Sequence, residues 1–162
     1  IITSIIKEFE GEGFNVIGID NILEELLTPL PGVLGAISPT ESDFENINLG
    51  IEFARDLGSR DLGQAVIISG DKIILSEDRH GTDNLINRFK QIKYNKPAYL
   101  VKVSKPKQDL RVDLPTIGSK TIEHMIEANL SGIIVEANKT FVENPKQTFK
   151  LINKYRLFFY AI

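Results

Sequence analysis

The second half of the sequence alternates apolar, β-branched stretches with segments whose apolar residues recur every three or four positions. The apolar stretches occupy residues 98–103, 132–136 and 157–160, and the helical patterns between them occupy residues 119–130 and 145–156. Such alternation favours a layered α/β domain with some parallel strands, because each helix returns the chain to the start of the next strand.

The middle of the sequence adds an antiparallel hairpin to this pattern. Two β-branched stretches, 64–69 and 72–76, flank a Gly70-Asp71 turn, which is a typical hairpin signal. The hairpin makes the expected sheet mixed. The fold class predicted from the sequence is therefore α/β, a layered mixed sheet with flanking helices.

Two further helices are expected around this hairpin. Ser38-Pro39-Thr40-Glu41 predicts a helix start with Ser38 as the cap, and Gly58 predicts its end. Thr82 is expected to cap a second helix over residues 83–92.

The first 37 residues are less regular. We expect a helix over 2–10, a strand over 14–18, a helical piece over 22–27 and a packed loop over 28–37, with a linker as the alternative for this last segment. The chain starts at Ile1, and its only methionine is Met125. We therefore expect a fragment of a longer protein, with residues 1–36 as a truncated interdomain segment and residues 37–162 as one domain.

The composition narrows the class of protein. With 162 residues, of which 42% are hydrophobic and 25% charged, the chain has the composition of an ordinary globular domain. The absence of cysteine excludes disulfides and thiolate sites. A formal charge of −3 argues against a general nucleic-acid binder, so no nucleic acid is expected as a partner.

Residues 105–118 form a charged loop between a predicted strand and a predicted helix. They bring together two carboxylates, three cations and an amide: Asp109, Asp113, Lys105, Lys107, Arg111 and Gln108. Carboxylates that hold a divalent cation, beside cations that hold phosphate oxygens, suit phosphoryl chemistry. The alternative is a solvated connection whose aspartates cap turns.

Two other stretches are weaker candidates. Residues 77–83 place acids, His80 and a glycine before a predicted helix, where free N–H groups favour anions. On these residues alone, an N-capped helix after a polar turn is the favoured interpretation. Residues 60–64 are polar and enter the hairpin. His124 lies within a predicted helix, and a surface or packing role is expected for it.

Three segments together resemble the C-terminal domain of the LpxI family: residues 51–66, the Gly81-Thr82-Asp83 turn and residues 102–118, with residues 131–136 also fitting. The resemblance covers essentially the whole chain. It implies a UDP-2,3-diacylglucosamine pyrophosphatase of lipid A biosynthesis, which releases UMP and 2,3-diacylglucosamine 1-phosphate. It further implies a divalent cation, usually Mg²⁺, a cytoplasmic enzyme at the inner membrane surface, a homodimer, and an N-terminal domain of nucleotide-binding appearance that precedes this one.

The resemblance also implies roles for individual residues. Either Asp109 or Asp113 is the family's essential acid, and we favour Asp113. The expected metal ligands are Asp113, Asp109, Asp83 and Glu77, and the expected substrate-binding residues are Arg111, Lys105, Gln108, Gln64 and Thr82. His80 and Arg79 depart from the family pattern, which expects a glutamate and an apolar residue there. Because the expected site lies between two domains, we expect this chain alone to be inactive.

Two other functions compete with this one. The first alternative is a non-catalytic regulatory module that binds a phosphosugar or nucleotide. The second is a hydrolase of another nucleotide-diphosphate sugar.

Overall fold

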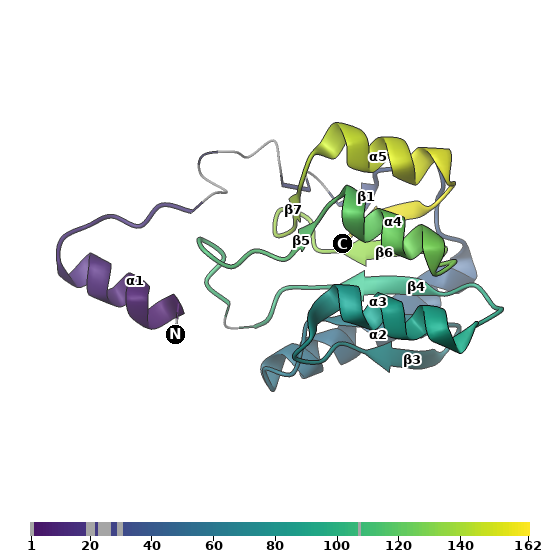
Figure 1. Cartoon of the computed structure of the whole chain (residues 1–162), viewed down its shortest axis with the longest axis horizontal. Coiled ribbons are helices and arrows are strands. Elements are labelled where there is room, and N and C mark those ends of the chain that lie inside the picture. Colours follow the sequence, from purple (N-terminus) through teal and green to yellow (C-terminus); the bar gives the residue numbers. More distant parts are fainter. Residues whose placement is uncertain (1, 19–21, 23–26, 29–30, 107) are drawn as a thin grey trace.

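The computed structural model describes residues 2–18, 22, 27–28, 31–106 and 108–162 (Figure 1). In this part of the chain, a six-stranded sheet has the order β1-β8-β6-β4-β2-β3, and a two-stranded sheet pairs β5 with β7. The elements are α1 (Ile2–Gly11), β1 (Gly32–Val33), α2 (Glu41–Ser59), β2 (Ala65–Ser69), β3 (Lys72–Ser76), α3 (Gly81–Ile92), β4 (Tyr99–Lys102), β5 (Thr116–Ile117), α4 (Ser119–Glu127), β6 (Gly132–Val135), β7 (Phe141–Val142), α5 (Pro145–Lys154) and β8 (Phe158–Ala161).

The large sheet is mixed, as predicted. Strands β4, β6 and β8 run parallel to one another, while β2 is antiparallel to β3 and β4, and β1 is antiparallel to β8. The carboxyl ends of β4, β6 and β8 therefore meet at one edge of the sheet. In open α/β sheets, ligands bind in the crevice outside this edge.

Helices cover both faces of the sheet (Figure 1). On one face, α2 buries Ile47, Ile51 and Ala54 against Val66 and Val101. On the other face lie α3, α4 and α5, and the core they share with the sheet includes the fully buried side chains of Phe89, Ile122 and Phe159. Side chains of alternate strand residues supply the two cores, which is why the central strands are apolar throughout.

Gly132 makes room for a large side chain in the centre of the sheet. It pairs with Phe158 of the neighbouring strand, and a Cβ atom at position 132 would lie 2.5 Å from the Phe158 ring. That ring packs against Tyr99, with 5.1 Å between ring centroids. The glycine is thus required by the space that the ring occupies.

Several element boundaries differ from the sequence predictions. Helix α2 begins after Thr40, whose side chain forms a capping box with Asp43, so Ser38 is not the cap. Helix α3 begins at Gly81, and Thr82 lies inside it rather than capping it. The cap of α3 is His80, which makes no side-chain capping hydrogen bond.

The first 37 residues depart most from prediction. Helix α1 is confirmed, but the strand expected over 14–18 is wrong, because these residues have no strand partner in the described part of the chain. The helical piece expected over 22–27 lies largely outside the described residues. Within the predicted packed loop, β1 pairs with β8, and the buried Thr28 hydroxyl donates to the Glu136 carbonyl oxygen. The domain boundary at residue 36 stays a prediction.

Among the described residues, none of the helices is long and apolar enough to cross a bilayer.

Candidate active site

The charged loop lies at the carboxyl edge of the sheet. It leaves β4 at Val103 and reaches β5 at Thr116, and the amino ends of α3 and α4 lie at the same edge because both helices follow the carboxyl ends of strands or the loop itself. Figure 1 shows the loop projecting from the sheet toward α1. This is the position at which α/β folds place ligand sites.

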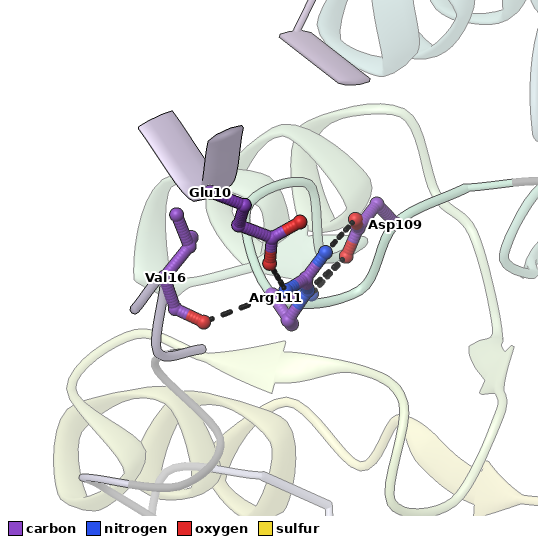
Figure 2. Close-up of polar contacts among 4 residues, drawn as sticks. All are labelled: Glu10, Val16, Asp109 and Arg111. Carbon is purple, nitrogen blue, oxygen red and sulfur yellow. Dashed lines mark hydrogen bonds and ion pairs between the residues drawn. The ribbon is translucent and has the colours of Figure 1, made fainter. Parts of the chain in front are cut away.

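Asp109 and Arg111 form a two-pronged ion pair in this loop (Figure 2). The Arg111 Nε and Nη2 atoms donate to the two carboxylate oxygens of Asp109 over 3.0 and 2.8 Å. Arg111 Nη1 donates to Glu10 of α1 over 2.6 Å and to the carbonyl oxygen of Val16 over 3.5 Å. The hydrogen bonds from Arg111 lower the pKa of Asp109 below its ordinary value. Asp109 is therefore held as a charged, oriented partner of Arg111.

Asp113 differs from Asp109 in its surroundings. Its backbone N–H donates to the Asp109 carbonyl oxygen over 3.0 Å, so the two aspartates are the first and last residues of a single turn. Its side chain is exposed, and among the residues that the structure describes its carboxylate has no hydrogen-bond or ion-pair partner. Asp113 and Asp109 line one hollow of about 680 Å³, whose wall also includes Lys105 and Gln108. Asp113 is thus the carboxylate available to a ligand.

Lys102 is a buried cation that sequence reasoning missed. Its side chain leaves the end of β4, is 7% exposed, and donates through Nζ to the Thr116 carbonyl oxygen over 2.9 Å. Burial lowers its pKa, and the negative charges of Glu77, Asp83 and Asp113 oppose this shift. A lysine that ends an otherwise apolar strand was the available signal.

Ala65 explains how Lys102 comes near Glu77. Ala65 pairs with Lys102 on β4, and its carbonyl oxygen accepts the Glu77 N–H on the other side. Directly paired residues point to the same face of a sheet, so the small Ala65 side chain lies between two long ones. The three residues therefore form a row across neighbouring strands, with Ala65 in the middle.

Glu77, Gln64 and Thr82 are brought together, but mainly with one another. One Glu77 carboxylate oxygen accepts the Gln64 backbone N–H over 2.5 Å, and the other accepts the Thr82 hydroxyl over 2.7 Å. Glu77 is buried. These contacts hold residues 77–82 against the start of β2. Glu77 and Thr82 therefore have a structural role in this conformation.

Asp83 faces α4 rather than the aspartates of the charged loop. Its carboxylate lies 3.4 Å from Lys120 Nζ and 3.5 Å from His124 Nδ1. His80 precedes α3 and is exposed, and its backbone N–H donates to Asp78. Arg79 lies beside His80, with 3.4 Å between Nε and Nε2.

Lys105 and Gln108 shape the first turn of the loop. The Lys105 N–H donates to Gln108 Oε1 over 2.8 Å, and Lys105 Nζ lies 2.6 Å from Asp61. Gln108 Nε2 is buried and has no acceptor among the described residues. Both side chains line the hollow that contains Asp109 and Asp113.

Glu136 is a second functional candidate that sequence reasoning missed. It follows β6, is 5% exposed, and accepts hydrogen bonds from the Ser104 N–H over 2.7 Å, from the Ser104 hydroxyl and from Arg55 over 3.2 Å. Burial on its own raises its pKa, but the hydrogen bonds from Ser104 and Arg55 outweigh burial, and the pKa is lowered. Glu136 fixes the start of the charged loop.

The four predicted metal ligands do not converge. The described residues contain no group of three or more His, Cys, Asp or Glu side chains placed to hold a metal ion. Asp109 pairs with Arg111, Glu77 with Gln64 and Thr82, and Asp83 with α4, as given above. Of the four, Asp113 is the one whose carboxylate meets no hydrogen-bond or ion-pair partner within the part of the chain that the structure describes. Magnesium needs only one or two protein carboxylates when substrate phosphates supply further oxygens, so the residues fit a site of that smaller kind.

This arrangement can be compared with known proteins. The LpxI C-terminal domain family matches residues 30–160. The chain belongs to the LpxI family. The UDP-2,3-diacylglucosamine pyrophosphatase LpxI of Caulobacter vibrioides is 32% identical to it over 149 residues, which cover 88% of this chain and 53% of that protein. The chain thus spans about half the length of this LpxI relative. The resemblance found in the sequence is confirmed.

Proposed function

We propose that this chain is the domain of a UDP-2,3-diacylglucosamine pyrophosphatase that supplies the charged groups for hydrolysis of the diphosphate, giving UMP and 2,3-diacylglucosamine 1-phosphate. The observation that carries the proposal is the exposed Asp113 carboxylate, set in a hollow at the carboxyl edge of the sheet beside the Asp109–Arg111 pair. The name of the Caulobacter relative supports the choice of substrate.

Hydrolysis of a diphosphate depends on positioning the water and stabilising charge on the phosphoryl oxygens. In the proposal, one Asp113 carboxylate oxygen orients the attacking water and the other is left for a cation, because neither has a hydrogen-bond partner among the described residues. Asp109 fixes the plane of the Arg111 guanidinium, and Arg111 attracts the phosphates. Lys105 does so as well once it leaves its ion pair with Asp61. Lys102, at the end of β4, donates a hydrogen bond to the Thr116 carbonyl oxygen. This contact attaches the loop that bears the two aspartates to β4.

We propose Mg²⁺ as the cofactor, with Asp113 as its protein ligand and substrate oxygens completing its coordination. Bound there, the cation would neutralise charge on the phosphoryl oxygens. Asp109, Asp83 and Glu77 would each have to break their present ion pairs or hydrogen bonds to bind the cation. We therefore propose them as secondary metal ligands, after Asp113. Gln64, Gln108 and Thr82 stay proposed substrate contacts.

The remaining expectations are also proposals. The match covers 53% of the relative. We expect a domain that corresponds to the rest of the relative to form the other wall of the site. The whole natural protein would then be active and this chain alone would not. We also propose a homodimer, and a location at the cytoplasmic surface of the inner membrane. The location agrees with a diacylated substrate, whose acyl chains favour a membrane.

The test is product analysis with the whole natural protein and UDP-2,3-diacylglucosamine, with Mg²⁺ and with a chelator in its place. The proposal predicts UMP in the first case and a loss of at least about a hundredfold in rate in the second. Binding of the lipid phosphate without UMP release would favour the non-catalytic module instead. Equal cleavage of an unacylated analogue would favour a hydrolase of another nucleotide-diphosphate sugar.

A further inference from the structure

A second hollow, of about 300 Å³, lies on the other side of the charged loop. Its wall contains Arg55 of α2, Ser104, Lys105 and Gln108 of the loop, Glu136 and Lys139. We call it the α2 pocket. It shares Lys105 and Gln108 with the hollow that contains Asp113, so the two are neighbours at the carboxyl edge of the sheet.

The α2 pocket has more positive than negative charge. Glu136 is shared by two cations, with 3.2 Å to Arg55 Nη2 and 3.7 Å to Lys139 Nζ. Two positive charges against one carboxylate leave a surplus of one. Lys105 adds little to this surplus, because its ammonium group is paired with Asp61.

The α2 pocket also has more hydrogen-bond donors than acceptors. The Glu136 oxygens already accept from Ser104 and Arg55. Arg55 uses only one of its five N–H groups within the described residues, and Lys139 lies beyond hydrogen-bond distance of Glu136. Gln108 Nε2 is buried on the wall and lacks an acceptor there. A ligand rich in acceptor oxygens would satisfy all three side chains.

We propose that the α2 pocket binds a phosphoryl group. A phosphate carries a charge of about −1.5 to −2 near neutral pH and three acceptor oxygens, which matches the surplus charge and the unused donors. Arginine binds phosphate through two parallel N–H groups, and the contact of Arg55 Nη2 with Glu136 holds the guanidinium at the pocket wall. Phosphate binding by the α2 pocket does not depend on the proposed function. The further idea that the bound phosphoryl group belongs to the diphosphate of the substrate rests on the proposed function.

The test is calorimetric titration of the whole natural protein with inorganic phosphate in the presence of a chelator. Arg55→Gln should weaken binding by at least about tenfold, and Lys139→Gln by about threefold or more, since each removes a charged donor. Lys146→Gln, at an exposed position on α5, is the matched control and should stay within about twofold.

Two further variants keep the test decisive. Arg55→Lys retains the ion pair with Glu136, so it guards against misfolding while it removes the guanidinium fork, and should still weaken binding measurably. Asp113→Asn should leave phosphate binding in the α2 pocket unchanged while it abolishes UMP release. Unchanged phosphate affinity in both Arg55→Lys and Lys139→Gln would overturn the proposal.

Steady-state kinetics identify the source of the phosphoryl group. If the α2 pocket holds a phosphate of the substrate, Lys139→Gln raises KM, and inorganic phosphate competes with UDP-2,3-diacylglucosamine. If it holds free phosphate, Lys139→Gln weakens phosphate binding and leaves KM unchanged; both results support the pocket. If phosphate binds to the α2 pocket as predicted but neither the wild type nor any variant releases UMP, the result would refute the proposed enzyme activity and not the α2 pocket.

Discussion

Lys102 Nζ donates a 2.9 Å hydrogen bond to the carbonyl oxygen of Thr116, and this contact joins the two ends of the charged loop. Lys102 is also the cation on which the charges of Glu77, Asp83 and Asp113 act. The residue therefore connects the sheet with the acids of the candidate site.

We expect Lys102→Met to lower kcat/KM for UMP release by about 10- to 100-fold, because the loop loses its anchor and the acids lose a nearby cation. Lys120→Met is the control, since the Lys120 side chain is 73% exposed and its one ion pair within the described residues is with Asp83, over 3.4 Å. It should change kcat/KM by less than about twofold. Equal kinetics in the two variants would argue against the role given to Lys102.

Arg111→Lys tests the two-pronged contact with Asp109. Lysine keeps the charge but cannot form two parallel hydrogen bonds, so we expect kcat/KM to fall by about tenfold or more. Arg60→Lys is matched to it, because Arg60, which follows the last residue of α2, forms an exposed ion pair with Asp56 of that helix. Wild-type kinetics in Arg111→Lys would show that the fork contact is dispensable.

Glu136 predicts a pH dependence of stability. Its pKa in the folded chain lies below the ordinary value of 4.5, so its contribution to folding is complete above that value and is lost as the pH falls through the lowered pKa. At pH 7, Glu136→Gln should lower the free energy of unfolding by about 2 kcal/mol, because charged hydrogen bonds are lost.

Denaturant unfolding measured at several pH values checks this prediction. The difference between wild type and Glu136→Gln should be largest near neutral pH and shrink in acid. A difference that stays constant from neutral pH down to about pH 3 would mean that the carboxylate charge does not cause it.

Gly132→Ala tests the packing of the central sheet. The added methyl group would lie 2.5 Å from the Phe158 ring, and we expect a loss of about 1–3 kcal/mol in the free energy of unfolding. Gly11→Ala is the control, since a Cβ atom there has no neighbour within 4 Å, and should change stability by less than about 0.5 kcal/mol. Thermal unfolding of both variants would show a large shift for Gly132→Ala alone.

The sequence predicted the mixed α/β sheet because its signals are local. The hairpin around Gly70-Asp71 and the buried stripes of α2 and α3 depend on residues a few positions apart. The strand expected over 14–18 failed because these residues meet no neighbouring strand in the described part of the chain, and strand formation depends on such a partner.

The candidate site was predicted less completely. Asp109, Arg111 and Asp113 could be found because they lie within one loop. Lys102 and Glu136 could not, since the first is near Glu77 only through pairing across Ala65, and the second meets Arg55 and Ser104 from distant parts of the chain. Sequence spacing alone also could not show that Asp109 is paired with Arg111 while Asp113 meets no partner among the residues that the structure describes.

The most direct test of the central claim compares UMP release by the whole natural protein with that of its Asp113→Asn variant, in Mg²⁺ and with UDP-2,3-diacylglucosamine. Asp71→Asn, in the exposed turn between β2 and β3, serves as the control. We predict a loss of at least about a thousandfold in kcat for Asp113→Asn and none for Asp71→Asn. A folded Asp113→Asn enzyme whose kcat stays within about threefold of wild type would contradict the assignment of Asp113.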